Sequence, residues 1–221
     1  MKEAHRETAR KIALKYLEAG DPLGWFEELY VQGSENSSII PWADLAPNPN
    51  LVDWLNDRRY PLSGRALKIG SGLGDDAEEL AQRGFDTIAF DISPSAIERS
   101  RVRFPESRVS YLVADLFTPP GEWKAGFDLV LESYTLQVLP PFLRREAIKI
   151  ISSFVAPGGI LLVITRGREE KEPVGNMPWP LTERELSTFN AQSLKELSFE
   201  DYRDCEDPPV RRFRVTYHRE R

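Results

Sequence analysis

The sequence predicts an α/β fold in which a doubly wound, mostly parallel sheet of seven strands carries helices on both faces. From residue 65 onward, short apolar strands alternate with amphipathic helices, as in parallel βαβ units. The segment 160–165 is almost continuously apolar, which is typical of a parallel strand buried on both faces. The link between the last two strands, 194–202 and 210–218, is too short for a crossover helix, so this C-terminal strand pair should be antiparallel.

The other elements follow from hydrophobic periodicity and from capping and turn residues. Helices are expected where apolar residues recur three and four positions apart, and strands where short apolar runs end at Gly, Asp or Glu. The expected helices are 3–18, 23–31, 50–57, 75–83, one that starts at 94 with Ser93 as its cap, 140–154 and 182–190. The remaining strands are expected at 65–69, 87–90, 109–113 and 127–131, and a turn is expected at 157–159.

The length of 221 residues suits a single domain, and we expect residues 1–221 to form one. Residues 61–221 should hold the sheet and its ligand site, and residues 1–60 should form a helical cover over the ligand edge of the sheet. The sequence lacks a run of about 18 apolar residues, so no membrane span is expected. The single cysteine cannot form an internal disulfide, which favours a cytoplasmic protein.

The charge distribution argues against a nucleic-acid partner. The net charge is −6, whereas nucleic-acid binding normally requires a basic face. Two local basic clusters, 99–103 and 211–214, alternate with apolar residues, and we interpret them as solvated faces of a helix and a strand. The sequence does not indicate an oligomeric state.

The first strand leads into a glycine-rich turn that comprises Gly70, Ser71, Gly72, Leu73 and Gly74. Glycines let a backbone turn sharply and approach a ligand closely, and the amides at the start of the next helix favour an anion such as a carboxylate. A dinucleotide fingerprint would need a small residue where this chain has Asp75, followed by Asp76. This acidic helix start favours a phosphate-free ligand with a cationic amine or sulfonium, such as S-adenosylmethionine (SAM).

Acidic residues also end the next strands. Asp91 follows the second strand, where an acid can accept hydrogen bonds from both hydroxyls of a ribose. Asp115 follows the third, where it can accept from an adenine amino group while apolar neighbours sandwich the ring. Besides the glycine turn and Asp75, the expected cofactor contacts are Asp91, Ile92, Ala114, Asp115, Leu116 and Glu132.

From residue 65 to the end, the series ALKIGSGLG, AFDIS, VADLF, DLVLES and APGG resembles the class I SAM-dependent methyltransferases, which have a Rossmann-like fold. In that family the glycine turn holds the methionine part of SAM, and acids at the positions of Asp91 and Asp115 hold ribose and adenine. The segments GWFE at 24–27 and IPWAD at 40–44 resemble the N-terminal cover of the thiopurine, tellurite and halide methyltransferase group. The resemblance implies SAM as cofactor, S-adenosylhomocysteine (SAH) as product, and no metal.

The chain departs from the family pattern at two positions. The family often has an acid two residues before the first glycine, where it helps to hold the methionine amine, but this chain has Lys68. That anchor is therefore absent, or Asp75 or a backbone carbonyl takes it over. A buried lysine is costly, so its ammonium must reach a carboxylate or the edge of the sheet. The second departure is Ser71, where the family often has cysteine.

Methyl transfer from SAM is a displacement at carbon, which needs a base for amines and hydroxyls but much less for a thiolate or halide. His5 and His218 lie near the termini, far in sequence from the strand ends. The catalytic candidates are Glu132 and Tyr134, and the substrate-side candidates are Trp25, Trp42, Tyr134 and Arg166, of which Arg166 suits an anionic substrate.

The sequence thus predicts methyl transfer from SAM to a small molecule with a soft or anionic nucleophile, such as a thiol, halide or metalloid. The acidic charge, the aromatic cover and the lack of a histidine base favour this reading. Three alternatives remain open: a SAM-binding module without catalysis, methylation of a protein or RNA, and a dinucleotide-dependent oxidoreductase. Asp75 and Asp76 oppose the last of these.

Overall fold

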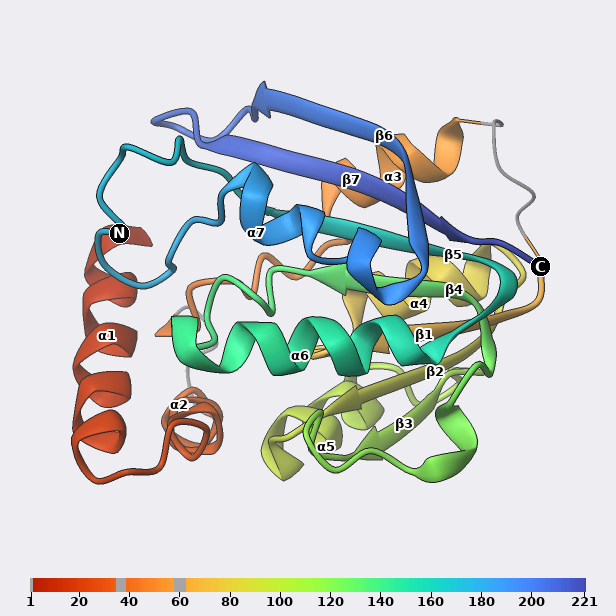
Figure 1. Ribbon diagram of the computed structural model, residues 1–221. Coiled ribbons are helices and arrows are strands. Elements are labelled where there is room, and N and C mark those ends of the chain that lie inside the picture. Colours follow the sequence, from red (N-terminus) through yellow and green to blue (C-terminus); the bar gives the residue numbers. More distant parts are fainter. Residues whose placement is uncertain (1, 35–38, 58–62) are drawn as a thin grey trace.

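The computed structural model describes residues 2–34, 39–57 and 63–221, and these form a twisted sheet flanked by helices (Figure 1). The sheet has seven strands in the order β3-β2-β1-β4-β5-β7-β6. Their bounds are β1 Arg65–Ile69, β2 Asp86–Asp91, β3 Ser110–Val113, β4 Phe127–Ser133, β5 Val155–Arg166, β6 Leu194–Arg203 and β7 Arg211–Arg219. Only β7 runs against its neighbours, β5 and β6, so the predicted mixed sheet with an antiparallel C-terminal pair is confirmed.

The strand order reverses at β1, which lies between β2 and β4. All three strands are parallel, so their carboxyl ends meet at one edge of the sheet. In sheets of this kind a ligand binds beyond that edge, at the point of reversal. The glycine turn follows β1 and therefore lies at this point.

The helices are α1 Lys2–Glu18, α2 Trp25–Gln32, α3 Pro49–Asn56, α4 Asp75–Gln82, α5 Pro94–Arg103, α6 Pro141–Phe154 and α7 Glu183–Ser187. Side-chain caps begin α3, α5 and α7. The Ser93 hydroxyl accepts from the Ala96 amide at 3.0 Å, as predicted for the start of α5. The last helix is shorter than expected, because it ends at Ser187 and a 3₁₀ turn at Asn190–Gln192 follows. None of the described helices has the length and apolarity needed to cross a membrane.

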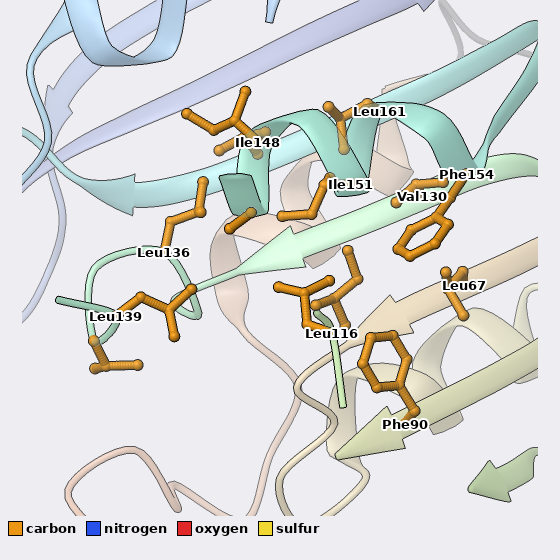
Figure 2. Close-up of a cluster of buried hydrophobic side chains, with 14 of the residues drawn as sticks. Leu67, Phe90, Leu116, Val130, Leu136, Leu139, Ile148, Ile151, Phe154 and Leu161 are labelled. Atoms are coloured by element: carbon orange, nitrogen blue, oxygen red, sulfur yellow. The ribbon is translucent and has the colours of Figure 1, made fainter. Parts of the chain in front are cut away.

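Apolar side chains fill both faces of the sheet. On one face, residues of β1, β2, β4 and β5 point toward α6, and the cluster includes Leu67, Val130 and Ile151 (Figure 2). On the other face, α3 and α4 join an apolar cluster with β1, β4 and β5 that includes Trp54, Leu80 and neighbouring aliphatic residues. Helices therefore cover both faces, as predicted.

The link between β3 and β4 differs from the regular alternation expected from the sequence. Among the described residues it contains no α-helix, only a 3₁₀ turn at Gly121–Trp123. Trp123 is 2% exposed and packs against Phe90 with ring centroids 4.9 Å apart. One large aromatic side chain thus fills the space that a crossover helix would otherwise cover.

The expected turn at 157–159 is part of β5, which begins at Val155 rather than at Ile160. Its pairing with β4 jumps from Phe127 opposite Val155 to Leu129 opposite Ile160. Gly158, with φ of +80°, lies within this irregular segment. The glycine-rich stretch therefore makes a bulge inside the strand.

The helices of the first 60 residues occupy two different places relative to the sheet, whereas a single cover over its edge was expected. Figure 1 shows α1 and α2 beyond the carboxyl ends of the parallel strands, as expected. In contrast, α3 packs on a face of the sheet, where Trp54 is 2% exposed and donates its Nε1 hydrogen to Thr216 Oγ1 at 3.0 Å. Thus α3 packs on a face of the sheet, while its first residues, Pro49 and Asn50, line the cavity at the ligand edge. The expected boundary near residue 60 falls in 58–62, outside the described residues.

Candidate active site

A cavity of about 620 Å³ opens at the carboxyl edge of the sheet, a volume typical of small-molecule sites. Its walls come from the glycine turn, the ends of β2 and β4, the loop after β3, the N-terminal segment and the β6–β7 loop. The expected cofactor residues in its wall are Gly70, Ser71, Gly72, Leu73, Asp75, Asp91, Ile92, Ala114, Asp115 and Leu116. The expected substrate-side residues in its wall are Trp42 and Tyr134.

The glycine turn has a backbone that only glycine adopts easily. Gly70, Gly72 and Gly74 have φ of +59°, +57° and +94°, in the left-handed region. A Cβ atom on Gly70 would lie 2.6 Å from Thr135 Oγ1, and one on Gly74 would lie 2.5 Å from Tyr111 Oη. The turn is therefore fixed by its neighbours as well as by its own torsion angles. Gly74 does not itself line the cavity. Because it has no side chain, the backbone can lie close to Tyr111 where α4 begins.

Asp91 is a buried carboxylate that fixes the backbone around it. It is 6% exposed, and it accepts hydrogen bonds from the Gly72 amide at 2.9 Å and from the Ser93 amide at 3.0 Å. Burial raises its pKa, while these amides lower it. Because each carboxylate oxygen has two lone pairs, both oxygens retain capacity for a further donor in the cavity.

Asp115 holds the turn after β3. One carboxylate oxygen accepts from the Phe117 amide at 2.8 Å, and the other has no partner among the residues that the structure describes. Ala114 and Leu116 flank it in the cavity wall. This part of the cavity therefore pairs a free acceptor with apolar surface, which suits a flat ring that carries an amino group.

The buried ammonium group of Lys68 is surrounded by oxygen atoms that compensate for its loss of water. Its side chain is 3% exposed, and Nζ donates to the carbonyls of Ile69 at 2.9 Å and Gly70 at 3.2 Å. It also lies 3.8 Å from Asp76 Oδ2, which confirms that the ammonium reaches a carboxylate. Asp76 in turn accepts from the backbone amide of Asn48 at 2.8 Å, so this ion pair ties the N-terminal segment to α4.

The proposed substitutes for the missing acidic anchor already have cationic partners. Asp75 accepts two hydrogen bonds from Arg103, at 2.7 and 2.8 Å, and the Gly70 carbonyl accepts from Lys68. The side chain of Asp75 is 15% exposed and the residue still contributes to the cavity wall. The charges at this end of the cavity are thus paired within the protein.

Aromatic residues of the cover meet above the glycine turn. Trp42 donates its Nε1 hydrogen to Tyr30 Oη at 2.8 Å, and both residues line the cavity. Burial raises the pKa of Tyr30, so its phenol stays protonated and keeps one hydrogen to donate. A Cβ on Gly72 would lie 3.1 Å from Tyr30 Oη, so the phenol is next to the turn. Sequence reasoning missed Tyr30, because it belongs to a short helix without a recognisable motif.

Trp25 requires a correction. It was expected on the substrate side, but it is 1% exposed and absent from the cavity wall. Its ring stacks on Phe26 with centroids 4.0 Å apart and meets the edge of Trp42 at 6.0 Å. Trp25 therefore packs behind Phe26 and Trp42 on the side away from the cavity, because its position in α2 directs its side chain toward the core.

Glu132 also requires a correction, both as a cofactor contact and as a catalytic candidate. It is fully buried and does not line the cavity. One carboxylate oxygen accepts from the amides of Thr135 at 2.7 Å and Leu136 at 2.8 Å, and the other has no partner in the described structure. Burial raises its pKa to about 7. Glu132 fixes the turn after β4 and lies outside the cavity wall, on the α6 face of the sheet.

Tyr134, the second catalytic candidate, lies in the cavity wall within a polar network. Its phenol accepts from Asn50 Nδ2 at 3.2 Å, and Asn50 Oδ1 accepts from the Tyr202 hydroxyl at 2.7 Å. The Arg212 guanidinium lies over its ring, 4.4 Å from the centroid. Burial raises the pKa of Tyr134, so the group is a hydrogen-bond donor and acceptor rather than a base at neutral pH.

Arg166, the fourth substrate-side candidate, is not in the cavity wall, although its register partner Arg212 stacks on Tyr134. His5 and His218 do not line the cavity either. In contrast, the exposed Cys205 does, together with its neighbours on the β6–β7 loop. Sequence reasoning did not predict this, because the loop reaches the cavity only through the fold.

The chain matches a family model described as a methyltransferase domain over residues 46–201. It is 33% identical over 127 residues to an uncharacterized methyltransferase of Mycobacterium tuberculosis, a match that spans 57% of this chain and 60% of that protein. It is 25% identical over 181 residues to a probable thiol methyltransferase of Arabidopsis thaliana, covering 80% of this chain and 75% of the other.

Among solved structures, the chain resembles 1,6-didemethyltoxoflavin-N1-methyltransferase of Burkholderia thailandensis, determined with SAH bound. The TM-score is 0.69 at 16% identity, and the match covers 89% of this chain and 88% of that one. The family model begins at residue 46, just before α3, in agreement with the packing of that helix on the sheet. The chain therefore belongs to the methyltransferase domain family, with the fold of class I SAM-dependent methyltransferases.

Proposed function

We propose that the protein transfers a methyl group from SAM to a small-molecule acceptor in this cavity. The observation that supports it most is the convergence of three strand ends on one cavity: the glycine turn, Asp91 and Asp115. Their chemistry fits SAM, because the turn has no room for Cβ atoms, buried Asp91 keeps lone pairs for two hydroxyls, and Asp115 keeps one free oxygen.

In this proposal the residues of the cavity bind SAM and orient it toward the acceptor. Asp91 accepts from the ribose hydroxyls, Asp115 accepts from the adenine amino group, and Ile92 and Leu116 enclose the ring. Tyr30 and Trp42 close the cavity over the turn and exclude water. When bound, SAM supplies a sulfonium-activated methyl group, and the protein contributes alignment of the acceptor with that methyl.

We further propose that the acceptor presents a soft or anionic nucleophile, such as a thiolate, halide or metalloid. The described cavity wall contains no histidine, Glu132 lies outside it, and Tyr134 stays protonated at neutral pH. The wall carboxylates Asp204 and Glu206 are engaged in ion pairs with Arg212. A neutral amine or hydroxyl would have to lose a proton to a base, whereas an anionic nucleophile would not. The likeness to a thiol methyltransferase is in keeping with this choice.

Two measurements test the proposal. Isothermal titration with SAM and with NAD(P) should give binding of SAM at sub-millimolar concentration and none of the dinucleotide. Methyl transfer from labelled SAM should then be followed on thiols, halides, metalloids, phenols and amines, with thiols or other soft nucleophiles preferred. Absence of SAM binding contradicts the whole proposal. Binding without turnover on any compound would instead indicate a SAM-binding module.

A further inference from the structure

Beyond Tyr134 the cavity ends at the β6–β7 loop, where arginines from three elements meet. Arg6 comes from α1, Arg166 from the end of β5 and Arg212 from β7. Arg166 and Arg212 are register partners on adjacent antiparallel strands, so their side chains lie on the same face of the sheet. Two guanidinium groups are therefore neighbours at the acceptor end of the cavity, and we call these three residues the arginine cluster.

The expectation that residues 211–214 form a solvated face is wrong for Arg212, which is buried. It is 2% exposed and forms ion pairs with Asp204 and Glu206, each at 2.6 Å. Its third nitrogen, Nη1, is buried and has no hydrogen-bond partner among the described residues. A buried guanidinium with an unused donor next to a cavity has capacity for one more acceptor.

Glu206 shows which kind of ligand the arginine cluster accommodates. It lines the cavity, and its two carboxylate oxygens bind different arginines: one lies 2.6 Å from Arg212 and the other 2.9 Å from Arg6. A planar carboxylate can accept from guanidinium groups through both of its oxygens. The carboxylate of Glu206 is thus itself bound by two arginines of the arginine cluster.

Arg166 is the member of the cluster whose charge is not neutralised by a direct contact. Its side chain makes no hydrogen bond or ion pair with the described residues, and its Nε is buried. Burial lowers its pKa to about 10, and the charges of Arg6 and Arg212 act in the same direction. It is nevertheless charged at neutral pH, and a half-buried cation without a counter-ion is costly.

We propose that Arg166, together with the free nitrogen of Arg212, binds a carboxylate that the methyl acceptor carries in addition to its nucleophile. This inference rests on the proposed function, because it places the acceptor at the end of the cavity opposite the glycine turn. Neither Arg166 nor Arg212 is in the cavity wall, but Tyr134 and Glu206 are: Arg212 contacts both, and the charge of Glu206 acts on Arg166. An anion at this end of the cavity therefore lies within electrostatic range of the cluster.

The acidic residues of the loop restrict the charge of the ligand. Asp204, Glu206 and Asp207 also line the cavity, and only the first two are paired with Arg212. A dianion such as a phosphate would be repelled by this rim more strongly than a monoanion. A monocarboxylate is therefore the class of ligand that the site favours.

The test compares a carboxylate with its neutral counterpart. Phenylacetate and phenylacetamide suit the aromatic wall of Trp42 and Tyr134, and each is titrated into the protein by calorimetry, with and without saturating SAH. The wild type should bind phenylacetate about 10-fold more tightly than the amide. Arg166→Met should remove that preference and leave the affinity for the amide unchanged.

Two further variants make the result specific. Glu206→Gln removes a competing negative charge and should strengthen phenylacetate binding. Arg211→Met is the matched control, since Arg211 is adjacent in sequence but forms its ion pairs with Asp201 and Glu169. It should leave the preference unchanged. Equal affinity for the two compounds in the wild type, no binding of either, or an equal loss in Arg211→Met overturns the proposal.

The outcome is separable from that of the proposed function. SAH affinity is measured for every variant, and Arg166→Met should retain it. Failure of the wild type to bind SAH contradicts the methyltransferase proposal, whereas normal SAH binding without carboxylate preference contradicts only the acceptor site. The melting temperature of Arg166→Met should equal or exceed that of the wild type, because an unpaired cation is removed. A lower melting temperature would indicate that Arg166 is structural.

Discussion

The two ends of the cavity are built in different ways. At the cofactor end, the glycine turn and Asp91 follow directly from β1 and β2, and the nearby charges are paired inside the protein, as Asp75 is with Arg103. At the acceptor end, the arginine cluster comes from α1, β5 and β7, and the Arg166 side chain has no direct partner in the described structure.

In the functions proposed above, the two ends of the cavity bind different ligands, the cofactor and the methyl acceptor. The cofactor end is shaped mainly by backbone conformation and by acids that bind backbone amides, so it suits one fixed ligand. The acceptor end is formed by side chains on separate segments and leaves hydrogen-bonding capacity unused. Changes at the first end should therefore affect folding and cofactor binding together, whereas changes at the second should affect acceptor selectivity alone.

The largest effect is expected at the glycine turn. Gly74→Ala places a methyl group 2.5 Å from Tyr111 Oη, and Gly84→Ala is the matched control, with φ of +97° and no atom within 4 Å. Both variants carry left-handed strain of about 1 kcal/mol, and Gly74→Ala must also displace Tyr111. We expect urea unfolding to give losses of about 3 kcal/mol for Gly74→Ala and about 1 kcal/mol for Gly84→Ala. Equal losses would mean that the contact with Tyr111 is unimportant.

Asp91→Ala should lower SAH affinity at least about 100-fold, equivalent to about 2.7 kcal/mol, because it removes both ribose acceptors and frees the Gly72 amide. Asp86→Ala, at the exposed start of the same strand, should bind SAH like the wild type. Calorimetry measures both, with circular dichroism to confirm folding. If a folded Asp91→Ala protein binds SAH normally, Asp91 is not part of the cofactor site.

Glu132 should make stability depend on pH. Its pKa is about 7 in the folded protein and close to its ordinary value of 4.5 when unfolded, so the folded state binds more protons between these values. The stability contributed by the protonated form is therefore present at low pH and is lost as pH rises through about 7. Relative to Glu132→Gln, the wild type should lose about 2 kcal/mol of unfolding free energy between pH 5 and pH 7. Parallel curves for the two proteins would contradict a raised pKa.

The smallest effect is expected at Asp115, which has one free oxygen for the adenine amino group. Asp115→Ala should weaken SAH binding about 10-fold, or about 1.4 kcal/mol, because one hydrogen bond is lost while the apolar ring contacts remain. Inosine-containing SAH, which lacks the amino group, provides the control ligand. It should bind the variant and the wild type with similar affinity. A similar 10-fold loss for both ligands would place the adenine elsewhere.

The residues predicted to bind the cofactor lie together in the cavity wall, except Gly74 and Glu132, because their sequence signals are local. A glycine turn, a cap or an acid after a strand occupies consecutive positions, so Asp91 and Asp115 were recognised without knowledge of the fold. The seven strands followed equally from periodicity. The packing of α3 on a face of the sheet was not predicted, since helical periodicity gives the apolar face of a helix but not the surface on which it packs.

The acceptor end was predicted poorly, because it depends on contacts between distant segments. Arg212 was expected in solvent, and only the antiparallel pairing of β5 and β7 brings it beside Arg166. Glu132 was misplaced for a different reason: alternation along β4 directs its side chain to the α6 face, one residue before the chain turns into the cavity at Ser133. A one-residue difference at a strand end thus decides whether a side chain meets the ligand.

The most direct test of the account is a crystal structure of the protein with SAH. We expect the ribose hydroxyls within hydrogen-bond distance of Asp91, the adenine amino group at Asp115 and the ring beside Leu116, with the sulfur directed toward Tyr134. SAH bound outside the cavity, or with its adenine at the β6–β7 loop, would contradict the assignment of the two ends.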